Sequence, residues 1–209
     1  MSGKFADRLN NSGIIGLITV QQLVFVTIGL VLWVVSGRHA SQFITFDVQQ
    51  AGKGLALGLL FIAIGLSAFK LFPNAMHKLM MDQQKGFSFI KEPLNWWQIV
   101  ALSIGAGLGE EALFRGGLQT LFSDYLPIWA AIFIASALFG VIHLHSHLIV
   151  FIITVMGAIF GIIYHSTGSL LIVMIAHSVY DIWAIHRLQV EFKKAGVFDS
   201  YKRDRTTLA

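Results

Sequence analysis

Six long runs of apolar residues, separated by short polar stretches, divide the chain. They cover about residues 14–36, 51–72, 96–121, 127–144, 148–165 and 169–187. A helix needs about 20 mostly apolar residues to cross a hydrocarbon core about 30 Å thick, and the runs are of that order. The pattern predicts an all-α integral membrane protein, a bundle of about six transmembrane helices at 1–187, followed by a charged cytoplasmic tail at 188–209.

The composition supports the membrane assignment. Of the 209 residues, 56% are hydrophobic and only 12% are charged, whereas a soluble domain carries about 25% charged residues. The sequence contains no cysteine, which excludes disulfides, thiolate nucleophiles and thiolate metal ligands. The net charge of +4 is informative about orientation in the membrane and gives no reason to expect a nucleic-acid partner.

The positions of the basic residues predict which side of the membrane each terminus occupies. With the N-terminus inside, 12 of the 15 Lys and Arg residues lie on the cytoplasmic side and two on the other side, with Arg115 inside a span. The twelve are Lys4, Arg8, Lys70, Lys78, Lys85, Lys91, Arg187, Lys193, Lys194, Lys202, Arg203 and Arg205, and the two are Arg38 and Lys53. Because cytoplasmic loops carry the excess of basic residues, we expect both termini in the cytoplasm of a multi-pass protein of the cell membrane.

Ionisable side chains interrupt three of the last four apolar runs. Apart from His165, His186 and Arg187 at the ends of runs, they are Glu110, Glu111, Arg115, His143, His177 and Asp181. A charged group at the centre of a bilayer costs about 3 kcal/mol on insertion scales, so such residues face a cavity or a partner and are candidates for function.

The spacing of these residues predicts some of their partners. Glu111 and Arg115 are four residues apart and share a helix face, with the acid on the favourable N-terminal side. Glu110 points about 100° away from Glu111 and needs another polar partner. His177 and Asp181 are also four apart, which fits either a functional pair or a structural pair that ties helices together.

Three short motifs together resemble a known family. Residues 110–115 (EEALFR) match EExxxR, residues 139–143 (FGVIH) match FxxxH, and residues 177–181 (HSVYD) match HxxxN/D. In this order on successive membrane helices they resemble the CPBP family, which comprises type II CAAX prenyl endopeptidases and bacterial abortive-infection relatives. The resemblance covers residues 96–187, which form the family-like core of the chain.

The resemblance implies an intramembrane glutamic endopeptidase that needs no metal or other cofactor. It implies that Glu110 is the general base, that His143 shares the attacking water with it, and that His177 and Asp181 hold the oxyanion. Independently, a carboxylate desolvated in a helix bundle becomes a better general base, because burial favours its protonated form. The implied partners are the lipid bilayer and a membrane-associated protein or peptide substrate.

One residue departs from the pattern of the prenyl endopeptidases, which have Asn where this chain has Asp181. An ionised carboxylate cannot donate a hydrogen bond to an oxyanion. Asp181 therefore either orients and charges His177 or stays protonated. Glu111 and Arg115 take a supporting role by the same resemblance and fix their helix.

Other functions fit part of the same residues. A zinc-dependent intramembrane protease could use His143, His147 and His177 with Glu110 or Asp181, although the HExxH motif is missing. A non-catalytic membrane scaffold or immunity protein could carry the same constellation. A transporter or proton relay also places ionisable residues inside membrane helices, but the chain has no internal repeat of the kind many transporters show.

Overall fold

The computed structural model describes residues 11–87, 90–143 and 146–199, and this part of the chain is helical and contains no strand. The helices are α2 (Asn11–Val35), α3 (Val48–Leu71), α4 (Pro73–Asp82), α5 (Trp96–Glu111), α6 (Thr120–Ser123), α7 (Ile128–Val141), α8 (His147–Thr167) and α9 (Leu170–Lys194). Two 3-10 turns, η1 (Ala40–Gln42) and η2 (Gln83–Lys85), and one π-helical segment, η3 (Ala112–Gln119), complete the elements. The predicted all-α class is confirmed.

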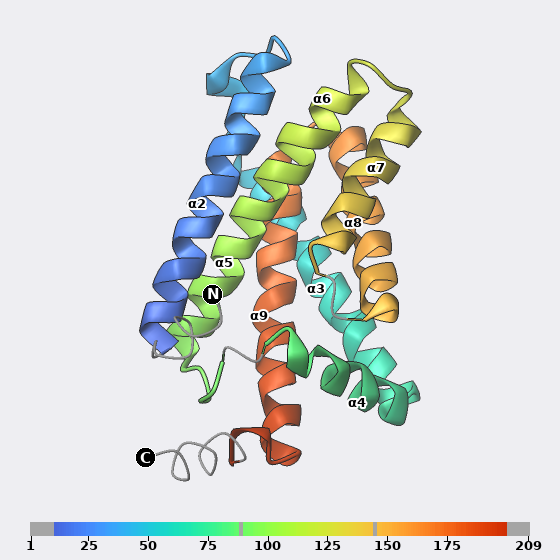
Figure 1. Cartoon of the computed structure of the whole chain (residues 1–209). Helices are drawn as coiled ribbons and strands as arrows, with labels where there is room; N and C mark the ends of the chain where they lie inside the picture. Colours follow the sequence, from blue (N-terminus) through green and yellow to red (C-terminus); the bar gives the residue numbers. More distant parts are fainter. Residues whose placement is uncertain (1–10, 88–89, 144–145, 200–209) are drawn as a thin grey trace.

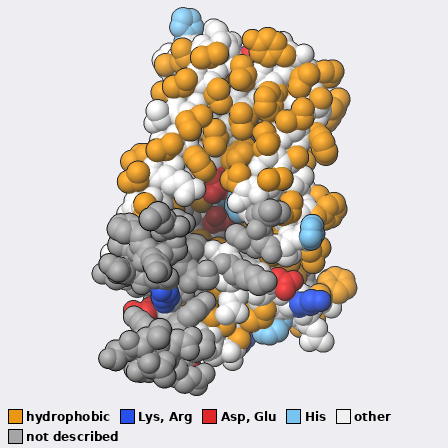
Figure 2. Space-filling view, viewed as in Figure 1, with side chains coloured by type: hydrophobic (Ala, Val, Ile, Leu, Met, Phe, Trp, Pro, Cys, Tyr) orange, Lys and Arg blue, Asp and Glu red, His pale blue; other side chains and the backbone are white. Residues whose placement is uncertain are grey.

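Each predicted span lies in a helical part of the chain, and the helices form one bundle (Figure 1). Four of them, α2, α3, α8 and α9, are long and apolar enough to cross a membrane. The helix α7 is apolar but shorter, and α5, η3 and α6 follow one another through the third predicted span. Hydrophobic side chains cover much of the face seen in Figure 2, and outward residues such as Phe133 are 66% exposed. These surfaces are suited to contact with lipid.

The helices differ from the predicted spans in three places. The helix α7 ends at Val141, so His143 lies beyond the helix, in a turn where its N–H donates to Gly140 O at 3.0 Å. The third span changes to π-helical geometry directly after Glu111. The helix α9 continues to Lys194, past the predicted boundary of the tail at 188, because Leu188 and Phe192 pack in a buried apolar cluster. Residues 200–209 of the predicted tail lie outside the described residues, and the division into domains stays a prediction.

The last helix is central to the packing. In Figure 1, α9 runs between α5 and α3, and it contacts both of them extensively. Gly107 makes the contact with α5 possible, since a Cβ atom there would lie only 2.1 Å from Ser178 Oγ. This close approach sets the end of α5, which carries the two adjacent glutamates, beside the middle of α9.

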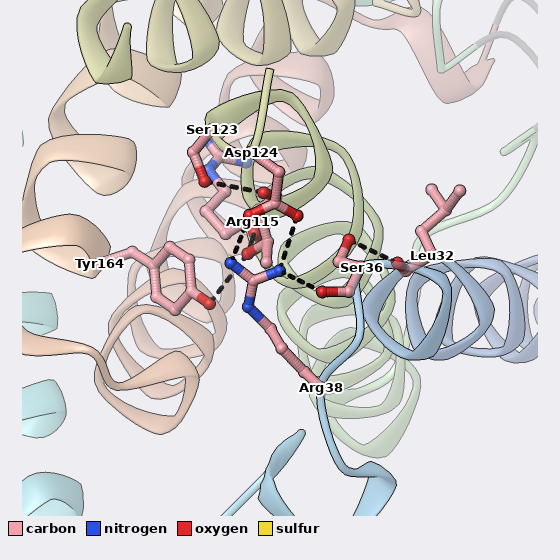
Figure 3. Close-up of polar contacts among 8 residues, drawn as sticks. Leu32, Ser36, Arg38, Arg115, Ser123, Asp124 and Tyr164 are labelled. Atoms are coloured by element: carbon pink, nitrogen blue, oxygen red, sulfur yellow. Dashed lines mark hydrogen bonds and ion pairs between the residues drawn. The ribbon is translucent and has the colours of Figure 1, made fainter. Parts of the chain in front are cut away.

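An ion pair joins two segments at the end of the bundle away from α4. Arg38, just after α2, donates from Nη1 and Nη2 to the two carboxylate oxygens of Asp124, at 2.8 Å each (Figure 3). The Arg38 guanidinium lowers the pKa of Asp124 below its ordinary value, chiefly through this hydrogen bond. The pair fixes the loop after α2 to the end of α6.

Candidate active site

The end of α5 carries two adjacent carboxylates into the interior of the bundle. The helix begins with a reciprocal cap, in which Gln98 N–H donates to Asn95 Oδ1 and Asn95 N–H donates to Gln98 Oε1. At its other end Glu110 is 9% exposed and Glu111 is fully buried. Their directions differ by about 100°, so the two acids meet different surroundings.

Glu111 forms the ion pair that the spacing predicts. Arg115 Nε lies 3.2 Å from Glu111 Oε2, and both side chains are at most 1% exposed. Arg115 Nη2 also donates to Gly157 O at 2.9 Å, and the guanidinium lies 4.7 Å from the ring centroid of Phe139 and 5.9 Å from that of Phe160. The cation is therefore held by a carboxylate, a carbonyl of α8 and two aromatic faces.

His177 lies among three carboxylates. Its Nδ1 is 2.9 Å from Glu111 Oε1, and its Nε2 is 3.5 Å from Asp181 Oδ2 and 3.9 Å from Glu110 Oε2. The ring of Phe160 stacks on the imidazole, with centroids 5.6 Å apart and an interplanar angle of 22°. Because the ionised carboxylate of Glu111 can only accept a hydrogen bond, Nδ1 of His177 carries a proton and donates a hydrogen bond to Glu111 Oε1. Glu111 thus links Arg115 on one side to His177 on the other.

His143 reaches the same region from the turn after α7. Its Nδ1 lies 2.9 Å from Phe139 O. Since a carbonyl oxygen can only accept, Nδ1 carries the proton in this bond, and a neutral ring then keeps an unprotonated Nε2. That nitrogen can accept a proton or a hydrogen bond from water.

A cavity of about 320 Å³ brings the four residues proposed for catalysis together. Glu110, His143, His177 and Asp181 all line it, with apolar side chains from α2, α3, α4, α8 and α9. Figure 2 shows acidic and histidine side chains in a hollow below the wide hydrophobic area. Glu111 and Arg115 are buried and are not among the described residues that line the cavity.

Sequence reasoning missed two kinds of site residue. Phe160, which stacks on His177, is one apolar residue among many in its span and gives no signal by itself. Gln22 on α2 also lines the cavity, and a glutamine within an otherwise apolar run could have singled it out.

The described residues contain no group of three or more His, Asp or Glu side chains arranged to hold a metal ion. His147, the third histidine of the zinc alternative, is the first residue of α8. It is not among the described residues that line the cavity, whereas His143 and His177 are.

The chain is similar to known proteins in the region that contains the candidate site. Residues 92–183 match the family described as type II CAAX prenyl endopeptidase Rce1-like, which confirms the resemblance drawn from the three motifs. The chain is 29% identical over 150 residues to the uncharacterized protein YpbD of Bacillus subtilis (strain 168), a match that covers 70% of this chain and 72% of the relative. No solved structure matches the chain. The family match supports protease activity at the level of the family.

Proposed function

We propose that this chain, whose residues 92–183 match the Rce1-like family of type II CAAX prenyl endopeptidases, cleaves peptide bonds within the membrane by a glutamate-activated water. The observation that carries the proposal is the meeting of Glu110, His143, His177 and Asp181 in one cavity inside the bundle. The substrate would be a membrane-associated protein or peptide. The apolar walls of the cavity suit a substrate that arrives from the bilayer.

In the proposed reaction Glu110 is the general base. A water molecule between Glu110 and the free Nε2 of His143 attacks the carbonyl carbon of the scissile bond, and Glu110 takes its proton. The tetrahedral intermediate carries the negative charge on the former carbonyl oxygen. When the carbon–nitrogen bond breaks, Glu110 returns the proton to the leaving amine.

His177 is the proposed oxyanion donor. Its Nδ1 proton is held by Glu111, so only Nε2 remains to face the reacting carbonyl. Asp181 lies 3.5 Å from Nε2, and its carboxylate would orient the imidazole that donates to the oxyanion. A preorganised donor of this kind stabilises charge that develops in the transition state. Arg115 and Glu111 would hold the ring in place.

The test is the Glu110→Gln variant, which keeps the shape of the side chain and removes the base. The probe is a quenched fluorescent peptide that ends in a farnesylated C-a-a-X sequence, supplied to the purified protein in proteoliposomes. We expect turnover to fall by at least about 10²–10⁴-fold, with an unchanged melting temperature because a neutral amide costs less to bury than a carboxylate. Full turnover by Glu110→Gln at equal protein levels would reject Glu110 as the general base, whereas absence of cleavage by the wild-type protein as well would favour a non-catalytic scaffold.

A further inference from the structure

Gln22 stands out among the residues of the first two long helices. Of the buried residues in α2 and α3, it alone has a polar side chain. It is 7% exposed, and its neighbour Gln21 is exposed on the outside of the helix. It also lies outside residues 92–183, so the family match assigns it no role.

The carboxamide oxygen of Gln22 has no hydrogen-bond partner among the described residues. This Oε1 atom is fully buried. A buried amide oxygen without a partner destabilises the folded state, because it loses its hydrogen bonds to water and gains none in return. An apolar side chain at this position would avoid that cost. The packing of the bundle therefore does not explain why the residue is a glutamine.

The position of Gln22 is set by glycines of α5. A Cβ atom at Gly109 would lie 2.1 Å from Gln22 Oε1 and 3.0 Å from Gln22 Cα. Gly105, one turn earlier, lies against the Cγ of the same side chain. The absence of side chains at these two positions lets Gln22 lie directly beside the residue that precedes Glu110, while it lines the same cavity.

We propose that Gln22 contacts the substrate, and that its carboxamide pairs with a peptide group next to the scissile bond. This rests on the proposed function, in which a peptide substrate enters the cavity. A carboxamide offers N–H donors and a carbonyl acceptor, as a peptide group does. A peptide backbone brought into a site shielded from water needs partners for its own N–H and C=O, and Gln22 provides both kinds beside the general base.

The experiment compares Gln22→Met with the matched control Gln21→Met, using the farnesylated peptide probe in proteoliposomes. Gln22→Met should lower kcat/KM by about tenfold or more, mainly by raising KM, because it removes binding that ground state and transition state share. Gln21→Met should leave kcat/KM and KM unchanged. The melting temperature of Gln22→Met should stay the same or rise, since the buried Oε1 has no hydrogen bond to lose among the described residues. A structural role for Gln22 predicts a lower melting temperature instead.

A second pair of substrates tests the contact itself. Replacing each of the two peptide bonds that flank the cleaved bond by an ester removes one N–H donor at a time. At one of these positions the ester should weaken processing by the wild-type protein and have little further effect on Gln22→Met, which is the signature of a direct interaction in a double-mutant cycle.

Two results would overturn this proposal. They are equal kcat/KM for Gln22→Met and Gln21→Met, or an ester effect that is the same in the wild type and in Gln22→Met. Failure of the proposed function is a separate result, because it appears as full turnover by Glu110→Gln. Loss of turnover in Glu110→Gln together with normal kinetics in Gln22→Met rejects the role of Gln22 alone.

Discussion

Glu111 and His177, which are 66 residues apart in the chain, are joined by a hydrogen bond of 2.9 Å between Oε1 and Nδ1. The other carboxylate oxygen of Glu111 faces Arg115 Nε at 3.2 Å. One buried carboxylate therefore compensates a cation on its own helix and orients a histidine on another. The two glutamates of the motif consequently have separable roles, and this separation can be tested.

Glu111→Gln should act mainly on stability, in contrast to Glu110→Gln, which should act mainly on turnover. The amide can still accept from His177 Nδ1, but it leaves the Arg115 guanidinium buried without a counter-charge. Loss of one partner of a buried pair typically costs about 3–5 kcal/mol. The measurement is thermal unfolding of both variants in the same detergent, with peptide cleavage measured at matched amounts of folded protein. Equal stability of the two variants would contradict the separation.

Arg115→Ala should destabilise the bundle by a similar amount, about 3–5 kcal/mol, and lower its level in membranes. The variant leaves the buried Glu111 carboxylate without its counter-charge. It also loses the hydrogen bond to Gly157 O and the contact with Phe139. Arg38→Ala is the control, because its ion pair is about one-third exposed and such pairs contribute about 0.2–1 kcal/mol. Combining Arg115→Met with Glu111→Gln should recover part of the stability, since neither charge is then left alone. A normal melting temperature for Arg115→Ala would refute the prediction.

Much of the fold could be predicted from sequence because lipid imposes a simple rule on the chain. Every spanning segment must pair its backbone internally, so a long apolar run becomes a helix. The pairing of Glu111 with Arg115 was also predictable, since it depends only on helical spacing. The motif residues Glu110, His143, His177 and Asp181 were identified by resemblance, and their roles stay a proposal.

Contacts between helices could not be predicted from local patterns in the sequence. Nothing in the sequence near Glu111 indicates that His177 is its neighbour, because that depends on how closely α5 and α9 approach at Gly107. Local patterns also do not indicate the π-helical segment after Glu111 or the early end of α7 at Val141. The stacking of Phe160 on His177 depends, like the contact of Glu111 with His177, on how the helices pack.

Both termini should face the cytoplasm. The start of α2 and the end of α9 lie at the same end of the bundle (Figure 1), where Asn11 Nδ2 donates to Glu92 O at 3.1 Å and Gln189 Nε2 donates to Leu94 O at 3.1 Å. The distribution of Lys and Arg, 12 against two, then selects the cytoplasm for that end. Reporter fusions after residue 12 and at residue 209 should both report inside, and one in the loop at residue 40 should report outside. An external C-terminus would contradict the predicted orientation.

Cleavage should not depend on zinc, because the proposed mechanism activates water with Glu110 and not with a metal-bound site. The purified protein should contain no stoichiometric zinc by elemental analysis, and its activity on the farnesylated peptide should survive exhaustive chelation.

His147→Ala gives an independent readout, since a zinc site built from the available histidines would need His147 with His143 and His177. The glutamate mechanism expects His147→Ala to cleave at the wild-type rate, whereas a ligand role expects a loss that added zinc partly restores. Activity that chelation abolishes and zinc alone restores would replace the glutamate mechanism by a metal-dependent one, because metal binding is then coupled to turnover.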